Sequence, residues 1–377
     1  MVAVFKAIEK KLRHAYKRRK LASSGIVEND GGAILVTGGL GDLIVIARFM
    51  RDLLEHLGGG SFSIFYSSPT VADMVFRSVP GFSGAYPSHF FKYAKDVYLY
   101  GLKINQFIYV EKWPGHRAMA LADTKIYELV RILEAYEKKI EPLHVVRMHH
   151  PFLDGTLGRY AAIKGRSRND FLHYAAGIPY GGDTLSLSGD DTILARHGLV
   201  PGRYITIHNG YDEAMQGPPG QRATKAYPGW GDVVSYLLEK FGKDLKVVQI
   251  GTEKTSAPIA GVDVNLIGKT SLKQALGLLA NAAFHLDNEG GFVHAAAAFG
   301  KKSCVVFGPT SVDYFGYRSN LNFSPLQCGD CWWSEKTWMM ACPRGDVVPT
   351  CMATYRAETL AHDIYNWSKI QGILPST

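Results

Sequence analysis

A turn with one acidic residue and two glycines, Glu289-Gly290-Gly291, stands between a buried-strand pattern and a helix of small residues. Such a junction lies at the carboxyl end of a strand, where backbone N–H groups face a ligand. The positive end of the following helix favours an anion there. We therefore expect the amides of Gly290 and Gly291 to hold a pyrophosphate, with a plain tight turn as the alternative. His294 belongs either to this site or to the core as a buried, hydrogen-bonded histidine.

The same theme occurs near the N-terminus, where Thr37-Gly-Gly-Leu-Gly-Asp42 follows a short apolar run. Its glycines, Gly39 and Gly41 among them, let the backbone turn tightly towards a ligand. Asp42 stands in the first helical turn, at the carboxyl edge of the predicted sheet. It is either a capping residue that complements the helix dipole or a general base. Ile44 occupies the place of a third small residue, so this is not a dinucleotide fingerprint.

A long Gly/Pro-rich loop over residues 210–228 ends in Thr224-Lys225-Ala-Tyr-Pro228. The loop is longer than a connection requires, which is typical of functional loops. Lys225 could supply a point charge to a phosphate, and the alternative is an ordinary solvent-facing lysine.

A second lysine stands in Gly268-Lys-Thr270, which resembles the end of a P-loop. Asp263 stands where the first glycine of a P-loop belongs, so that interpretation fails. We predict instead a turn into a helix, with Thr270 or Ser271 as its cap.

Four cysteines with the spacing C-x2-C-x10-C-x8-C lie in one short, Trp-rich segment; they are Cys328, Cys331, Cys342 and Cys351. Closely spaced thiolates suit tetrahedral coordination of zinc or iron. No histidine accompanies them, so we predict a closed, structural metal site, with disulfides or free thiols as the alternative. Cys304, in an apolar strand pattern, is predicted to be an inert core residue.

The 377 residues carry a formal net charge of +8, and no apolar run approaches the length of a membrane span. No secretory signal pattern follows Met1, so a cytoplasmic location is expected. Basic residues crowd positions 6–20, where apolar residues recur at helical spacing. This arm is either a solvated helix or tail, or a peripheral contact with the inner face of an anionic membrane. Nucleic acid is not an expected partner, because no reader motif occurs.

Alternating strand and helix patterns predict an α/β protein with parallel sheets and crossover helices. The pattern restarts near residue 204, and the length also favours two domains. The expected divisions are a basic arm (1–25), an N-terminal Rossmann-like domain (26–195), a second Rossmann-like domain (200–352) that includes the cysteine segment (328–351), and a C-terminal helix (353–377).

The clearest helix patterns cover residues 42–57, 69–79, 123–140, 230–241, 271–281 and 356–371. The clearest strand patterns cover residues 33–37, 62–66, 204–210 and 245–250. The aromatic stretch over residues 85–120 does not reveal the order of its elements.

Taken together, these motifs resemble the ADP-heptose heptosyltransferases of glycosyltransferase family 9. The matching segments are Gly39-Leu-Gly-Asp42, Thr224-Lys-Ala-Tyr-Pro228, Gly268-Lys-Thr-Ser-Leu272, Asn288-Glu-Gly-Gly-Phe-Val-His294 and Phe307-Gly-Pro-Thr310. The resemblance implies a GT-B architecture, in which two Rossmann-like domains face each other across a cleft, here with a small cysteine-rich metal finger.

The resemblance further implies an inverting transfer of a sugar, heptose from ADP-heptose, without a catalytic metal. Asp42 would be the base that deprotonates the acceptor hydroxyl, in an acceptor-side loop with Gly39 and Gly41. The implied donor-binding residues are Thr224, Lys225, Glu253, Thr270, Glu289, Gly290, Gly291 and His294. Among them, Glu253 would hold the ribose and Thr270 the adenine. Glu289 departs from the aspartate that the family generally has, so the identity of the sugar stays open.

The cysteine segment looks most like the iron-binding finger of the family branch that glycosylates bacterial autotransporter adhesins and assembles into large rings. The resemblance therefore implies a homo-oligomer, and it leaves two acceptors open: a protein side-chain hydroxyl or a lipid-linked core sugar of lipopolysaccharide. Two other classes remain as alternatives, an NAD-type nucleotide-dependent oxidoreductase and a non-catalytic nucleotide-binding scaffold. The incomplete glycine fingerprint counts against the oxidoreductase.

Overall fold

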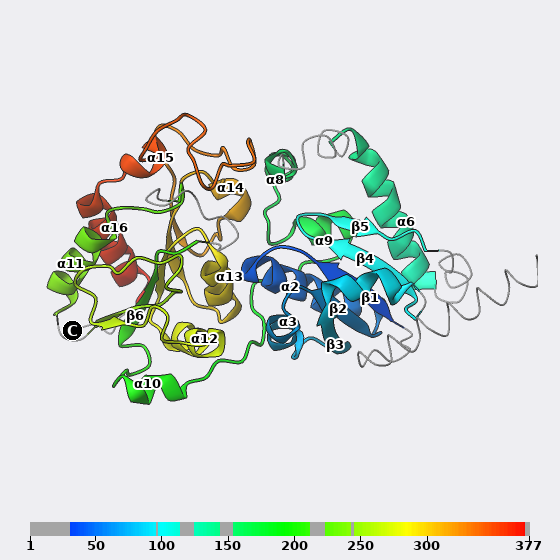
Figure 1. The fold of residues 1–377 in the computed structure, drawn as a ribbon, viewed down its shortest axis with the longest axis horizontal. Coiled ribbons are helices and arrows are strands. Elements are labelled where there is room, and N and C mark those ends of the chain that lie inside the picture. Colours follow the sequence, from blue (N-terminus) through cyan, green and yellow to red (C-terminus); the bar gives the residue numbers. More distant parts are fainter. Residues whose placement is uncertain are drawn as a thin grey trace, which may run out of the picture. The chain divides into compact units, whose positions relative to one another are not determined.

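The computed structural model of the chain describes residues 31–95, 97–113, 124–143, 154–211, 223–242 and 245–373. The predicted basic arm over residues 1–25 lies outside this part of the chain, as do residues 212–222 of the long loop. Helices and strands alternate along the described residues (Figure 1). Among these helices, none is long and apolar enough to cross a membrane.

The chain divides into two compact units, and each is described by itself. The first unit comprises residues 1–38, 46–141 and 172–181, and the second comprises residues 39–45, 142–171 and 182–377. Residues 39–45, which include Asp42 in the first turn of a helix, therefore belong to the second unit. The rest of that helix belongs to the first unit.

A five-stranded sheet forms the centre of the first unit, in the order β3-β2-β1-β4-β5. Its strands are β1 (Gly32–Val36), β2 (Phe62–Tyr66), β3 (Phe82–Pro87), β4 (Tyr100–Ile104) and β5 (Ile108–Val110). All pairs are parallel except β4 with β5, which is antiparallel. The helical segments around it are α2 (Leu40–Leu57), α3 (Pro69–Phe76), the short η1 (Ser88–Phe90), α4 (Phe91–Ala94), α6 (Thr124–Lys139) and α9 (Phe171–Ala176).

A six-stranded, all-parallel sheet forms the centre of the second unit, in the order β11-β10-β9-β6-β7-β8. Its strands are β6 (Tyr204–His208), β7 (Lys246–Gln249), β8 (Val264–Asn265), β9 (His285–Asn288), β10 (Ser303–Val306) and β11 (Leu321–Phe323). Counted from β6, this is the 3-2-1-4-5-6 order of a Rossmann fold. The direction of strand addition reverses between β6 and β9, and ligands bind at such a point in open α/β sheets.

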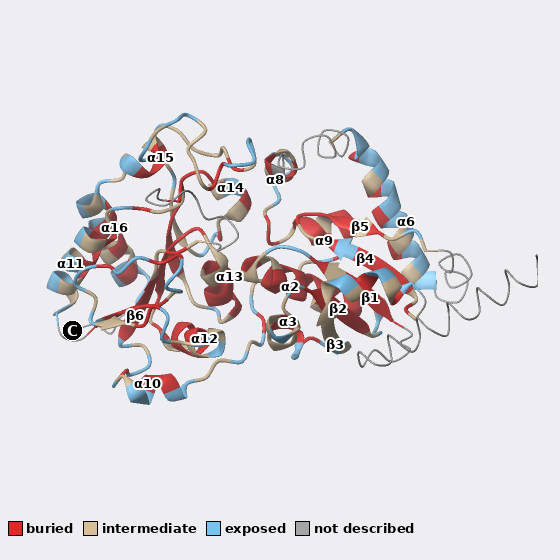
Figure 2. Cartoon of the chain, viewed as in Figure 1, coloured by how far each residue is buried: buried red, intermediate tan, exposed pale blue. Residues whose placement is uncertain are grey.

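The helices of the second unit are α8 (Asp154–Ile163), α10 (Thr192–Arg196), α11 (Trp230–Phe241), α12 (Leu272–Asn281), α13 (Gly291–Ala298), α14 (Val312–Phe315), α15 (Thr350–Ala353) and α16 (Ala357–Ile370). Burial follows the sheets and the inner sides of these helices (Figure 2). One core cluster joins Ile205 and Leu286 of the sheet to Trp230 of α11 and Ile364 of α16. The predicted C-terminal helix thus packs within the second unit.

Most of the predicted elements are confirmed within a few residues, and α11 matches its predicted range at both ends. The predicted helix over residues 69–79 is too long, because α3 already ends at Phe76 with Arg77 as its cap. Ser271 caps α12 with a reciprocal capping box to Gln274, as the turn prediction requires. Cys304 is fully buried in β10, where burial raises the pKa of its thiol. It is the core residue that the apolar pattern predicts.

A buried carboxylate, Asp52 of α2, links this helix to α9 and to the residues that follow α9 within the first unit. Its oxygens accept hydrogen bonds from His173 Nε2 at 2.8 Å and from the Gly181 N–H at 2.8 Å, and Arg51 pairs with it at 2.7 Å. Burial alone would raise the pKa of this carboxyl, but these partners outweigh burial and lower the pKa from 3.8 to about 2. The ionised form of Asp52 therefore stabilises the fold.

We expect the stability contributed by this ionised carboxylate to be lost in acid. It is fully present above the unfolded-state pKa of 3.8 and disappears as the pH falls through the folded-state value of about 2. The urea midpoint of the wild type should therefore exceed that of Asp52→Asn by a constant amount above about pH 5, and the difference should shrink below about pH 4. Asp73→Asn, which opens an exposed pair with Arg77, is the control. A difference that stays constant down to pH 2.5 would contradict this role.

Candidate functional site

The turn between β9 and α13 presents backbone amides at the end of a strand. Gly290 has extended backbone angles, with φ −170° and ψ −178°, and α13 begins at Gly291. The N-cap residue of α13, Gly290, has no side chain to cap the first amides, and no other side chain in the described residues is seen to bond them. A Cβ atom added at Gly290 would lie 3.6 Å from Asp287 Oδ2. A strand end followed at once by a helix N-terminus is an arrangement that favours anions, and the binding of a pyrophosphate here stays a prediction.

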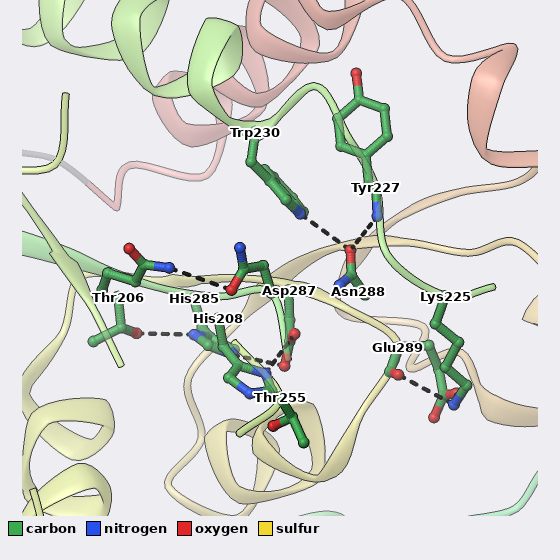
Figure 3. A network of polar contacts seen from close by, with 12 residues as sticks. Thr206, His208, Lys225, Tyr227, Trp230, Thr255, His285, Asp287, Asn288 and Glu289 are labelled. Atoms are coloured by element: carbon green, nitrogen blue, oxygen red, sulfur yellow. Dashed lines mark hydrogen bonds and ion pairs between the residues drawn. The ribbon is translucent and has the colours of Figure 1, made fainter. Parts of the chain in front are cut away.

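Lys225 reaches this turn from the long loop and forms an ion pair with Glu289 (Figure 3). Its Nζ also donates to the backbone oxygen of Glu289 at 3.3 Å. Both side chains are largely buried, with exposed fractions of 13% for Lys225 and 8% for Glu289. The structure therefore brings together Lys225, Glu289 and the glycine turn, and the solvent-facing alternative for Lys225 is wrong.

The position of Lys225 depends on the cysteine segment. The Thr224 N–H donates to Met339 O at 3.0 Å, and the Thr224 hydroxyl donates to Trp338 O at 2.9 Å. The Trp338 ring centroid lies 5.6 Å from Lys225 Nζ, within the range of a cation–π contact. Trp338 and Met339 stand between Cys331 and Cys342 in the sequence, so Thr224 is an anchor of the loop rather than a free ligand-binding hydroxyl.

Asn288 fixes the other side of the same loop. Its Oδ1 accepts hydrogen bonds from the Tyr227 N–H at 3.3 Å and from Trp230 Nε1 at 3.0 Å (Figure 3). The start of α11 is thereby attached to the end of β9, and the lysine loop cannot move away without breaking these bonds.

Two further predicted residues, Glu253 and Thr270, lie on neighbouring loops. The Gly268 N–H donates to Gly251 O at 2.9 Å, which joins the loop after β7 to the turn before α12. Glu253 is exposed and packs over Gly268, where an added Cβ would lie 2.7 Å from its Oε1. Gly268 also has φ +69°, so glycine is favoured there for two reasons.

The Asp42 carboxylate is held by Gly39 and Arg168, which also belong to the second unit. Its Oδ2 accepts a hydrogen bond from the Gly39 N–H at 3.0 Å, so the capping interpretation is confirmed. Its Oδ1 pairs with Arg168 at 2.8 Å, and the Arg168 side chain is only 1% exposed. Sequence reasoning missed Arg168, because nothing local marks a partner 126 residues away.

The glycines beside Asp42 permit close backbone contact. A Cβ atom added at Gly41 would lie 2.5 Å from the His294 ring, and one added at Gly291 would lie 3.3 Å from Gly41 N. His294 is buried and its Nδ1 lies 2.7 Å from the Tyr317 hydroxyl. This arrangement bears out the alternative in which His294 is a hydrogen-bonded core histidine.

The four cysteines of the predicted metal finger are free thiols in the structure. Burial first, and neighbouring thiols second, raise the pKa of Cys331 to about 11 and that of Cys351 to about 12. The thiols are therefore near one another. However, no group of three or more metal-ligating side chains is arranged to hold an ion in the described residues. The predicted metal site is therefore not confirmed.

Sequence reasoning also missed a row of polar side chains on β6 and β9, namely Thr206, His208, His285 and Asp287. Polar residues at alternate positions of two buried strands were the available signal. Strands buried on both faces in a parallel sheet are usually apolar throughout.

Comparisons with known proteins agree with the motifs. The model of glycosyltransferase family 9 (heptosyltransferase) matches residues 223–339. Lipooligosaccharide heptosyltransferase 2 of Haemophilus influenzae is 43% identical over 51 residues, which are 14% of this chain and 15% of that protein. The matched stretch is thus a small part of that relative's length.

Three solved structures share the fold. The E. coli ADP-heptose lipopolysaccharide heptosyltransferase II has a TM-score of 0.56 at 13% identity, covering 90% of this chain and 99% of that chain. The dodecameric iron-containing heptosyltransferase TibC, solved with ADP-D-beta-D-heptose, has a TM-score of 0.58 at 13% identity, covering 92% and 77%. A family 9 glycosyltransferase of Veillonella parvula has a TM-score of 0.55 at 13% identity, covering 91% and 99%.

At such identities these structures show the fold, a mixed α/β protein with parallel sheets like those of the GT-B heptosyltransferases. The family match includes Lys225, Glu289 and the glycine turn, and it supports a glycosyltransferase as the enzyme class. The resemblance to glycosyltransferase family 9 (heptosyltransferase) is thereby confirmed, and residues 223–339 carry it.

Proposed function

We propose that the protein is an inverting, metal-independent glycosyltransferase that moves a sugar from a nucleotide diphosphate to a bacterial acceptor hydroxyl. The observation that carries this proposal is the buried Lys225–Glu289 pair beside the uncapped amides of α13, inside the segment that the family model matches. We propose ADP-heptose as the donor, because TibC was solved with ADP-D-beta-D-heptose and shares this fold.

The diphosphate would be held by Lys225 and by the amides of Gly290 and Gly291. Charge that develops on the leaving diphosphate is stabilised by such preorganised donors. Glu289 forms an ion pair with Lys225. A diphosphate must therefore compete with the Glu289 carboxylate for this cation, which leaves Glu289 available to accept hydrogen bonds from the sugar. Glu253 and Thr270 would hold the ribose and the adenine on the neighbouring loops.

Asp42 would take the proton of the acceptor hydroxyl as this hydroxyl attacks the anomeric carbon. Its carboxylate is 22% exposed and is oriented by Arg168 and by the Gly39 N–H. A partly exposed carboxylate held in a fixed orientation is the kind of group that acts as a general base. We propose Arg168 as the residue that orients this base.

The acceptor and the cellular setting are part of the proposal. The acceptor is a hydroxyl either of a protein, such as an autotransporter, or of the lipopolysaccharide core. We propose that residues 26–195 form the acceptor domain and residues 200–352 the nucleotide-sugar domain. We propose further that the enzyme is cytoplasmic, that it forms a homo-oligomer, and that its basic arm contacts the inner membrane.

The Asp42→Asn variant tests the catalytic proposal. It keeps an oxygen for the Gly39 N–H but removes the base, so turnover of an ADP-sugar with acceptor should fall by roughly a hundredfold or more. The dissociation constant of ADP, measured by calorimetry, should stay within about twofold. Asp313→Asn, at an exposed position of α14, is the matched control and should keep full turnover. Wild-type turnover in Asp42→Asn would remove Asp42 from the role of base.

Opposite effects are expected at the two members of the buried ion pair. Lys225→Gln should raise the dissociation constant of ADP by about tenfold, because one charged donor is lost. Glu289→Gln should lower it several-fold, because the competing carboxylate is removed, while turnover declines. Lys273→Gln, exposed on α12, is the control for a lost positive charge. Equal weakening by both variants would mean that the pair serves the fold and not the ligand.

We also propose one structural iron or zinc ion at Cys328, Cys331, Cys342 and Cys351, supported by the spacing of these cysteines and by the shared fold of the iron-containing TibC. Metal analysis of the purified chain should find about one equivalent per chain, because four thiolates complete one tetrahedral site. Cys331→Ser should release it, whereas Cys304→Ser should not. Without metal, the raised pKa values keep Cys331 and Cys351 protonated and slow to react at neutral pH. Absence of metal together with four free thiols would contradict the site.

A further inference from the structure

A row of polar side chains crosses the point where the strand order of the second sheet reverses. Strands β6 and β9 are paired there in register, with Thr206 opposite His285 and His208 opposite Asp287. Within each strand the two polar residues alternate with apolar ones, so all four side chains lie on the same face (Figure 3). The intervening Ile207 and Leu286 belong to the apolar core on the other face.

Asp287 is the charged centre of this row. It is fully buried, and burial alone would raise the pKa of its carboxyl. The two neighbouring histidines reverse this effect and lower the pKa below its ordinary value. Asp287 Oδ1 lies 2.9 Å from His208 Nδ1, and Oδ2 lies 3.2 Å from His285 Nε2. An ionised carboxylate only accepts hydrogen bonds, so both of these ring nitrogens carry protons.

The two histidines differ in what their second nitrogen meets. His285 Nδ1 lies 2.9 Å from the Thr206 hydroxyl, so both of its nitrogens are hydrogen-bonded, and its ring is only 1% exposed. His208 is 12% exposed and lies edge-to-face with Phe292, 4.9 Å between ring centroids. In the part of the chain that the structure describes, His208 Nε2 makes no hydrogen bond. It is the open end of the row.

A second polar atom lies next to this open end. A Cβ atom added at Gly210 would be 2.6 Å from His208 Nε2 and 2.6 Å from Ser256 Oγ. One added at Gly251 would also collide with Ser256 Oγ. The Ser256 hydroxyl is buried, and among the described residues it has no hydrogen-bond partner. A buried hydroxyl without a partner is costly, which indicates a missing ligand atom.

The location of these atoms defines the chemistry of that ligand. His208 is the last residue of β6, and Ser256 lies in the loop after β7. Asp287 lies beside Gly290 of the glycine turn. A buried carboxylate so close to the turn would repel a diphosphate unless its charge is neutralised. The two histidine N–H groups offset that charge, and His208 Nε2 and the Ser256 hydroxyl lie close to each other at this edge.

We propose that His208 Nε2 and Ser256 Oγ form a subsite for an oxygen of a diphosphate, with Asp287 and His285 as positioning residues. This inference rests on the proposed function, since it assigns further ligands to the same donor. His208 Nδ1 donates to Asp287, and protonated Nε2 donates to the phosphoryl oxygen. The Ser256 hydroxyl gives that oxygen a second donor. Gly210 and Gly251 are required because a side chain at either position would occupy the space.

Ser256→Ala is the sharpest test, because it removes a hydroxyl that makes no hydrogen bond to any described residue. The thermal midpoint of this variant should equal or exceed that of the wild type. The dissociation constant of ADP should rise about fivefold, whereas that of adenosine, which lacks phosphate, should not change. His208→Gln should raise the dissociation constant of ADP by about tenfold and leave that of adenosine unchanged. Ser235→Ala and His362→Gln, at exposed positions of α11 and α16, are the matched controls.

The positioning role of Asp287 has its own readout. Asp287→Asn should lower the thermal midpoint of the protein. At a temperature where this variant is folded, it should bind ADP more weakly than the wild type and adenosine equally well. A purely structural role would weaken both ligands equally, and that outcome would overturn the role.

Inorganic pyrophosphate separates this proposal from the proposed function. If the wild type binds pyrophosphate but not ADP, and Ser256→Ala loses pyrophosphate, the subsite stands and the nucleotide donor is wrong. If the wild type binds ADP and both Ser256→Ala and His208→Gln bind it as tightly, the subsite is wrong and the proposed function is untouched. Equal loss of ADP and adenosine in both variants would likewise overturn the assignment to a diphosphate.

Discussion

The backbone pairing of β6 with β9 determines where polar chemistry can occur in the second unit. Because strands are added outward from this pair in both directions, the loops that follow the two strands diverge at their carboxyl ends. The loop after β6 leads to Lys225, and the turn after β9 carries Glu289. The Lys225–Glu289 ion pair therefore lies at the carboxyl ends of β6 and β9, where the strand order reverses. The loops that follow these two strands meet there because the strands are neighbours in the sheet.

Charged side chains near this edge are paired within the chain. Lys225 is paired with Glu289, Arg168 with Asp42, and Asp287 with two histidines. Burying an unpaired charge is expensive, so these charges need partners within the chain. Under the proposed function, a diphosphate would have to offer Lys225 better oxygen acceptors than the Glu289 carboxylate does.

Local patterns predicted most elements of the fold, since helices such as α11 and the capped start of α12 are encoded by neighbouring residues. The aromatic stretch after residue 85 resisted prediction because its short segments, β3 to β5, are stabilised by tertiary packing such as that of Phe65 against Phe91 and Tyr98. In the site, motifs located Lys225, Glu289 and the glycine turn. They could not locate Arg168 or Ser256, because those positions acquire meaning only from partners distant in the sequence.

The hydrogen bonds from Thr224 to the backbone of Trp338 and Met339 tie the lysine loop to the cysteine segment. The Thr224 amide can exchange its hydrogen with solvent only when those bonds open. Local opening that separates the backbone of Trp338 and Met339 from the lysine loop therefore also exposes the Thr224 amide to exchange.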